Sequence, residues 1–206
     1  MTMARAELVA DLRGILMDAA SKFTDDEPLE RHLDLAALDM GRVRRRTLIG
    51  EITLVANQPD YDAPADLIEV KFPLWGVDEQ RTRKAWESNH PGRLPDLQRY
   101  EYNGAYKLRL VPSPSATQIA DLGATYKFYY FAGHQIGAVE ANTTVRAQDR
   151  HLLLIRAAAH ALQELANNNI TKPVQLGGSG VGAMPKNGTP AALAKDLLAL
   201  WEQMAA

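Results

Sequence analysis

The amino-acid sequence predicts an α+β protein: a helical bundle with an inserted antiparallel β-rich subdomain and an extended C-terminal tail that ends in a helix. Three observations support this class. Apolar residues recur with helical spacing at both ends of the chain, strand-like spacing replaces it between residues 47 and 132, and a glycine-rich segment precedes a last amphipathic stretch. With 206 residues, 46% of them hydrophobic, the chain can bury a core without disulfides or metals.

Two helices are predicted at the N-terminal end. The first runs from about Ala4 to Phe23, and its single apolar stripe consists of Leu8, Leu12, Ile15, Leu16, Ala19 and Phe23. Acidic residues and Pro28 then indicate a break and a new helix start. The second helix spans Leu29 to about Val43. It leads into a cluster of cations, which are favourable near a helix C-terminus: Arg42, Arg44, Arg45 and Arg46.

Residues 47–132 predict four to six strands. Runs of β-branched and apolar residues mark strands over 49–55, 68–74 and 125–132. Asn103-Gly104 between 97–102 and 106–111 is a strong hairpin signal. A short polar helix carrying Trp86 is predicted from Asp78 to Glu87. On the aromatic strand 125–132, alternation predicts one set of side chains in the core and the other at the surface or an interface.

Helix returns at about Val145 and continues to Leu165. This helix is apolar nearly all round, and its narrow polar stripe gives three candidates for a subunit interface: Arg156, His160 and Gln163. Residues 171–188 are expected to form a flexible linker. Thr189-Pro190 then predicts the start of a final helix, whose apolar stripe is formed by Leu193, Leu197, Leu200, Trp201 and Met204.

The predicted domain organisation has three parts. Residues 1–46 and 143–169 form a helical body, residues 47–142 form the inserted β-rich subdomain, and residues 170–206 form a Gly-rich linker and a docking helix. The last helix needs a surface to cover its apolar face, either on its own body or on a partner.

Composition excludes several classes of function. The chain has 23 basic and 25 acidic residues, a formal charge of −2, which excludes DNA binding by bulk positive charge. It has no cysteine, so thiolate metal sites and cysteine nucleophiles are impossible. Charged residues interrupt the first 20 positions, and no stretch approaches the ~20 apolar residues of a membrane span. We therefore expect a soluble product made in the cytoplasm.

No catalytic or cofactor motif emerges from the remaining residues. The glycine run 177–182 lacks the Lys-Ser/Thr of a phosphate loop and the following helix of a dinucleotide site. His151 and His160 are nine residues apart and do not share a helix face, as zinc-binding histidines would. We expect no metal, no cofactor and no enzymatic activity. A small α+β hydrolase that uses His134 or His160 stays open as an alternative.

The arginine cluster is the one pronounced electrostatic feature. Arg42, Arg44, Arg45 and Arg46 are compatible with a solvated helix end. They are also compatible with a surface that faces nucleic acid or acidic groups of a partner. In a ring of identical subunits the cluster would be repeated, so the charge of the single chain would understate the field.

Four segments occur in an order that resembles the tailed-bacteriophage head-to-tail adaptor (connector or neck) proteins. They are residues 61–70 (YDAPADLIEV), 108–114 (LRLVPSP), 126–130 (YKFYY) and 143–165. The last of these segments contains the long apolar helix. In this family two N-terminal helices precede a β insertion and a long closing helix. The resemblance covers about residues 29–165; the 78–95 loop and the glycine-rich tail have no counterpart.

The resemblance implies a structural virion protein in the phage neck. It would form a homo-oligomeric ring, expected to be a dodecamer, beneath the portal protein and would link the portal to tail, collar or terminator proteins. The ring would surround the exit channel and contact packaged DNA non-specifically, with Arg42, Arg44, Arg45 and Arg46 facing the channel or an interface. The tail residues Leu193, Leu197, Leu200, Trp201 and Met204 would dock on the portal or a neighbouring subunit. Another neck module, a head-completion or tail-terminator protein, is the nearest alternative.

Overall fold

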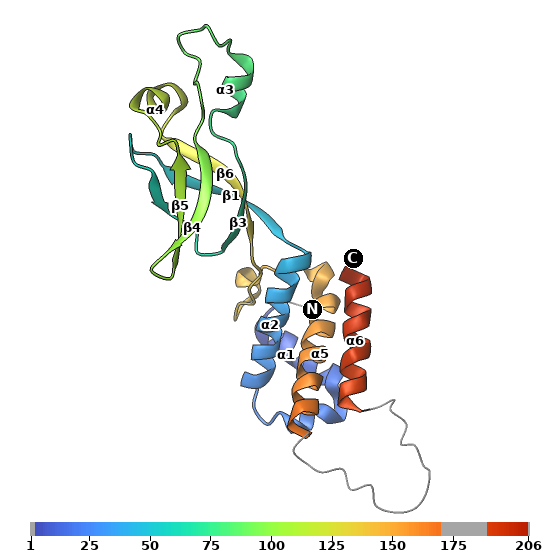
Figure 1. The fold of residues 1–206 in the computed structure, drawn as a ribbon. Helices are drawn as coiled ribbons and strands as arrows, with labels where there is room; N and C mark the ends of the chain where they lie inside the picture. The colour runs from blue at the N-terminus through green and yellow to red at the C-terminus, as the bar shows by residue number, and fades with distance from the viewer. Residues whose placement is uncertain (1–2, 170–188, 206) are drawn as a thin grey trace, which may run out of the picture. The chain divides into compact units, whose positions relative to one another are not determined.

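The computed structural model describes residues 3–169 and 189–205, and the chain divides into two units (Figure 1). The helical unit comprises Met1–Arg44 and His134–Ala206, and the β unit comprises Arg45–Gly133. The sequence predicts an insertion at residues 47–142, which starts two residues later and ends nine residues later than this β unit. Helices and antiparallel sheets are both present, and a helix follows the last undescribed stretch, so the predicted α+β class is confirmed.

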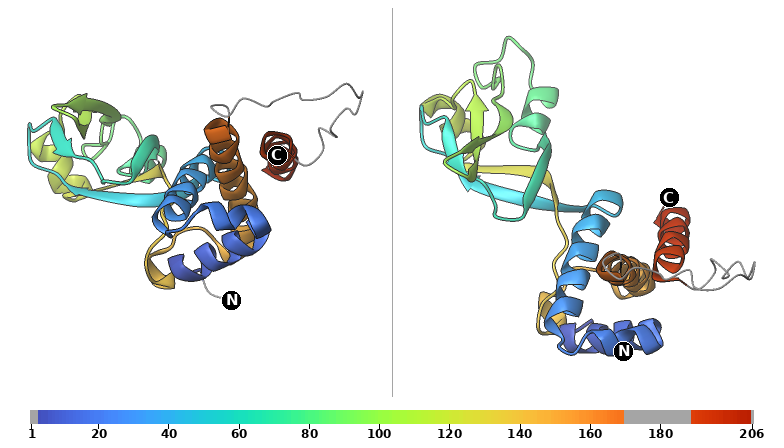
Figure 2. Two further views of the ribbon diagram at one scale, coloured as in Figure 1. Left: turned by 90° about the horizontal axis from the view of Figure 1, so that it is seen from below. Right: turned by 60° about the horizontal axis from the view of Figure 1, so that its bottom comes forward.

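The helical unit is built around one central helix. Its helices are α1 (Arg5–Leu16), α2 (Glu27–Val43), α5 (Arg150–Asn169) and α6 (Pro190–Ala205), with short 3₁₀ segments η1 (Met17–Lys22), η2 (Glu140–Asn142) and η3 (Ala147–Asp149). In both Figures 1 and 2, α5 lies between α2 and α6. The apolar faces of all four helices meet in one core, which includes Leu8, Leu33 and Leu153. This position of α5 explains why the sequence shows it to be apolar nearly all round.

The predicted first helix is wrong beyond Leu16. Met17 takes a positive φ of 49°, which ends the regular helix, and the chain continues as η1. Ile15 belongs to the predicted stripe but is 40% exposed, whereas Phe23 is buried and meets His32 edge-on. Apolar spacing alone cannot reveal this break, because Ala19 and Phe23 continue the helical period across it.

Two three-stranded antiparallel sheets form the β unit. The strands are β1 (Arg46–Thr53), β2 (Asp60–Asp62), β3 (Leu67–Pro73), β4 (Asp96–Tyr102), β5 (Ala105–Val111) and β6 (Thr125–Ala132). The strand orders are β1-β6-β3 and β2-β5-β4. The predicted hairpin is confirmed: β4 and β5 pair through Asn103 and Gly104, which both have positive φ, as a two-residue turn of this kind requires.

The core of the β unit depends on β6. Tyr126, Phe128 and Tyr130 alternate into the interior, while Lys127, Tyr129 and Phe131 point to the other face. The predicted alternation on this strand is therefore confirmed. Burial raises the pKa of the Tyr126 hydroxyl, which donates a hydrogen bond of 3.2 Å to the Pro95 carbonyl.

Two short helices of the β unit differ from the sequence prediction. The helix expected from Asp78 to Glu87 is α3, which covers only Val77–Thr82; Trp86 lies beyond it and is 82% exposed. Sequence analysis missed α4 (Ala116–Leu122). Its start carries a capping box, in which the Ser115 side chain accepts from the Gln118 backbone N–H and the Gln118 side chain accepts from Ser115 N–H. That Ser-x-x-Gln pattern was available in the sequence.

Gly50 gives a testable packing constraint. It faces Phe128 across the β1–β6 pair, and an added Cβ would lie 2.5 Å from the ring. We expect Gly50→Ala to lower the free energy of unfolding by about 1–3 kcal/mol, because the core is overpacked. The measurement is denaturant unfolding of both variants. Gly14→Ala is the control: nothing lies within 4 Å of its added Cβ, so a gain of about 0.5–1 kcal/mol is expected. An unchanged stability for Gly50→Ala would contradict the packing.

Candidate interaction surfaces

The four clustered arginines divide between the two units, and each has a partner. In the helical unit, Arg42 pairs with Asp39 at 3.1 Å, and Arg44 donates to the Met204 carbonyl at 3.2 Å. In the β unit, Arg45 pairs with Glu69 at 2.9 Å, and Arg46 donates to the Gly133 carbonyl at 3.1 Å. The Arg42 side chain is 82% exposed and that of Arg45 is 44% exposed, so Arg42 keeps the greater access to an external anion.

Asp39 organises the polar side of the helical unit. Its carboxylate accepts from Arg156 Nε at 2.7 Å and lies 3.0 Å from His160 Nε2, and it also pairs with Arg42. Burial raises the pKa of Asp39, but the hydrogen bonds from Arg156 and His160 outweigh it, so the net shift is downward. Two of the three predicted subunit-interface residues, Arg156 and His160, therefore hold α2 against α5 within one chain.

Arg156 also connects this cluster to α6. Its guanidinium carbon lies 5.0 Å from the centre of the Trp201 ring, within cation–π range. Gln163, the third interface candidate, donates to the Asn167 side chain at 3.2 Å. All three candidates line a cavity of about 350 Å³ between α5 and α6.

The tail helix packs on its own chain. Trp201 and Ala194 are buried in the helical core, and Leu197 is packed against it. Among the five predicted docking residues, Trp201 is thus covered within the chain, while Leu193, Leu200 and Met204 are each about 40% exposed. The expected cap is present: Thr189 Oγ1 accepts from the Ala192 N–H at 3.2 Å. The linker predicted at 171–188 and the glycine run 177–182 lie outside the described residues.

Sequence analysis missed an exposed apolar pair on α2. Leu35 and Leu38 are 40% and 59% exposed. They lie between Arg31 and Arg42 at the spacing i, i+4, i+7, i+11, which places all four on one helix face. That spacing is visible in the sequence, next to the stripe of Leu33, Ala36, Ala37 and Met40 on the buried face of the same helix.

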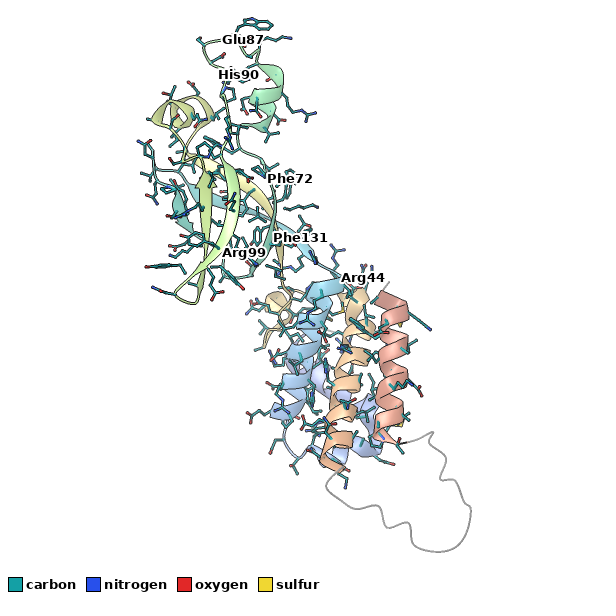
Figure 3. All side chains as sticks on the ribbon, viewed as in Figure 1. Arg44, Phe72, Glu87, His90, Arg99 and Phe131 are labelled. Carbon is teal, nitrogen blue, oxygen red and sulfur yellow. The ribbon has the colours of Figure 1, made fainter. Side chains whose placement is uncertain are left out.

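A second apolar surface lies on the β1-β6-β3 sheet, on the face to which the sequence assigned the outward set of β6 side chains. Tyr129 pairs with Ile49 on one side and Phe72 on the other, and the rings of Phe72 and Tyr129 are 4.9 Å apart. Next to this row, the cations of Arg45 and Lys71 lie 5.2 and 5.3 Å from the ring centre of Phe131. Figure 3 shows Phe72 and Phe131 on the β unit.

The histidines considered for a hydrolase do not form a catalytic pair in the described structure. His134 Nε2 lies 2.7 Å from the Arg44 carbonyl, and Nδ1 lies 3.2 Å from the Thr144 carbonyl. His160 pairs with Asp39, as described above. In the 83–95 loop, where Figure 3 labels Glu87 and His90, His90 Nδ1 accepts from the Gly92 N–H at 3.1 Å. Contacts of this kind stabilise the local backbone and the packing of helices.

His32 is the buried histidine of the core. It is 3% exposed, and its Nε2 lies 3.2 Å from a Glu164 carboxylate oxygen without the alignment of a hydrogen bond. Burial lowers the pKa of His32, although the Glu164 carboxylate acts in the opposite direction. The folded protein therefore resists a proton that the unfolded chain accepts at a pH of about 6.5.

This burial predicts a pH-dependent stability. Because the unfolded state binds more protons, the free energy of unfolding should fall as the pH drops below about 6.5. We expect His32→Leu to show a smaller fall than the wild type between pH 7 and pH 5, measured by urea unfolding. The exposed His151 provides the control, and His151→Gln should keep the wild-type slope. Equal slopes for wild type and His32→Leu would contradict the burial effect.

Residues 3–169 and 189–205 contain neither a candidate membrane span nor a candidate metal site. No helix in these ranges is both long enough and apolar enough to cross a membrane. In the same ranges, no group of three or more histidine or carboxylate side chains is arranged to hold a metal ion.

Comparison with known proteins gives one family. A family model described as SU10 adaptor protein matches residues 3–176. The match covers the β unit and the helical unit from α1 through α5, and it ends before α6. No curated protein matches the sequence. The resemblance to phage head-to-tail adaptors, seen first in four short segments, is therefore confirmed at the level of the family.

Proposed function

Because the chain belongs to the SU10 adaptor family, a family of phage head-to-tail adaptors, we propose that it forms a ring beneath the portal and links the portal to the tail or collar. Adaptors are structural proteins rather than enzymes, and the neck of the virion is where they act. The observation that carries the proposal is the extent of the match, which includes both units rather than one of them.

The expected partners follow from this position. The ring contacts the portal protein on one side and tail, collar or terminator proteins on the other, and it surrounds the DNA exit channel. We take twelve subunits as the stoichiometry because the resemblance implies it. Contact with packaged DNA is non-specific and electrostatic, since repeated exposed cations attract phosphates whatever the sequence.

Arg42 is the strongest candidate for a cation that faces DNA or a neighbour. Its side chain is largely exposed although its Nη1 pairs with Asp39. Arg44, Arg45 and Arg46 make intramolecular contacts and contribute to the same field at longer range.

The C-terminal helix carries the proposed docking surface. Leu193, Leu200 and Met204 are exposed on α6, and we assign them, rather than Trp201, to contacts with the portal or a neighbouring subunit. Trp201 stabilises the attachment of α6 to α5.

Imaging of purified virions tests the function. The expected result is a twelve-subunit ring of this chain directly below the portal. Light scattering of the purified chain with and without portal protein should show a complex of the portal and multiple copies. A hexameric ring at the distal end of the neck would support a tail terminator instead, and absence of the chain from virions would overturn the proposal.

Charge reversal at Arg42 tests the electrostatic part. We expect Arg42→Glu to lower the yield of DNA-filled particles several-fold, because each subunit then presents a repelling charge to phosphate. Lys22→Glu is the matched control, since Lys22 is an exposed cation on η1 that the proposal leaves without a role. DNA content per particle is the measurement. Equal DNA content in the two variants would contradict the proposed position of Arg42 in the channel.

A further inference from the structure

The α2 helix presents an apolar stripe to solvent. Arg31, Leu35, Leu38 and Arg42 share one face, and the two leucines are 40% and 59% exposed. Both arginines have partners in the chain, Glu164 and Asp39, but their side chains remain 60% and 82% exposed. The stripe therefore consists of two leucines bounded at both ends by accessible cations.

The α6 helix presents a second stripe with the same spacing. Leu193, Leu197, Leu200 and Met204 also follow i, i+4, i+7, i+11. Leu197 is packed against the core, while Leu193, Leu200 and Met204 are each about 40% exposed. Asp196 and Gln203 are exposed on the outer border of this stripe.

These two stripes cannot cover one another within one chain. Both helices pack on α5, and Figures 1 and 2 show them on different sides of it. The stripes match in length, because each extends over 12 residues of helix, whose end residues lie about 16 Å apart along the axis. They also match in charge, since the α2 stripe ends in arginines and the α6 stripe is bordered by an aspartate.

We propose that the α2 stripe of one copy packs against the α6 stripe of the next copy. This is a heterologous contact, which generates a ring when its rotation closes. This inference rests on the proposed function, because the contact would build the proposed ring. A second copy is the occupant that accounts for both stripes at once, because each copy then uses each stripe once. A different partner bound to one stripe would leave the other exposed.

Engineered cysteines test the contact directly, because the chain has no native cysteine. The full-length variant with both Leu38→Cys and Leu200→Cys is concentrated and oxidised mildly. We expect a ladder of covalent oligomers beyond the dimer on non-reducing gels. Each single-cysteine variant alone should stay monomeric, and an equimolar mixture of the two should yield dimers and nothing larger. Both positions are exposed, so the fold should be retained; circular dichroism checks this.

The control pair combines Leu38→Cys with Lys195→Cys. Lys195 is exposed on α6 at a position about 140° around the helix from Leu200. The proposal is overturned if the Leu38/Leu200 pair cross-links no more than this control. Dimers from either single variant would overturn it as well, because they indicate a symmetric contact. A ring in virions without the ladder would refute this contact alone, whereas a ladder from a chain absent from virions would refute the proposed function alone.

Discussion

Asp39→Ala is expected to lower the free energy of unfolding of the helical unit by about 2–4 kcal/mol. The substitution leaves Arg156 and His160 without the carboxylate that they share, and their side chains are only 18% and 25% exposed. Removing one partner of a fully buried pair costs about 3–5 kcal/mol, and the partial exposure here reduces that figure. Urea unfolding followed by helical circular dichroism is the measurement.

The exposed ion pair of Asp34 and Arg5 is the control that separates the effect of burial from the effect of charge. Asp34 makes two hydrogen bonds with Arg5, at 2.8 and 3.0 Å, but its side chain is 50% exposed. We expect Asp34→Ala to cost no more than about 1 kcal/mol, since exposed ion pairs contribute little. If Asp39→Ala and Asp34→Ala cost the same, the α2–α5–α6 cluster is not a specific source of stability.

The sign of the Asp39 pKa shift adds a pH dependence. Its folded-state pKa is lowered, so its contribution is present above the unfolded value near 3.9 and is lost as the pH falls through the folded value. The decrease in the free energy of unfolding caused by Asp39→Ala should therefore be largest at neutral pH and should become smaller in strong acid. This window lies below that of His32, so the two effects can be measured separately in one protein.

The described part of the fold was predictable where local signals act alone. Asn103-Gly104 specifies a turn by backbone conformation, and the strand at 125–132 alternates strictly, so both were placed correctly. The second helix was placed within two residues at its start because Pro28 and the acidic residues mark it. Such features depend on neighbours in the sequence and on nothing farther away.

Tertiary contacts decide the features that the sequence did not reveal. Four cations within five residues predict one patch, but the unit boundary at Arg44 and Arg45 divides them. Asp39, Glu69 and two backbone carbonyls bind them. The polar stripe Arg156–His160 predicts a subunit interface; within the chain, a carboxylate of α2 contacts both residues and the ring of Trp201 contacts Arg156. Sequence periodicity shows which side chains share a face; it does not show which partner occupies that face.

Phe128→Ala is expected to have the largest effect on the β unit, about 3–5 kcal/mol in the free energy of unfolding. Phe128 is fully buried between Tyr126 and Tyr130, whose ring centres lie 6.3 and 5.8 Å from its own. Its removal leaves a cavity that the two sheets cannot fill without changing their pairing. Gly50, which lacks a side chain opposite the ring, cannot replace the lost contacts.

Phe131→Ala is the matched control for this strand. Phe131 lies three residues farther along β6 on the outer face, where it contacts the cations of Arg45 and Lys71, so we expect a loss of about 1 kcal/mol in the free energy of unfolding.

The two units can be followed separately during unfolding. Trp75 reports on the β unit, because it is buried 5.6 Å from the Tyr126 ring, and Trp201 reports on the helical unit. The two cores share no residue among those described, so Phe128→Ala should destabilise the β unit while helical circular dichroism of α2, α5 and α6 persists to higher denaturant. Simultaneous loss of both signals at one lower midpoint would show instead that the two units unfold as one. In that case a defect in the β unit would also disrupt the α2 and α6 stripes that we assign to ring assembly.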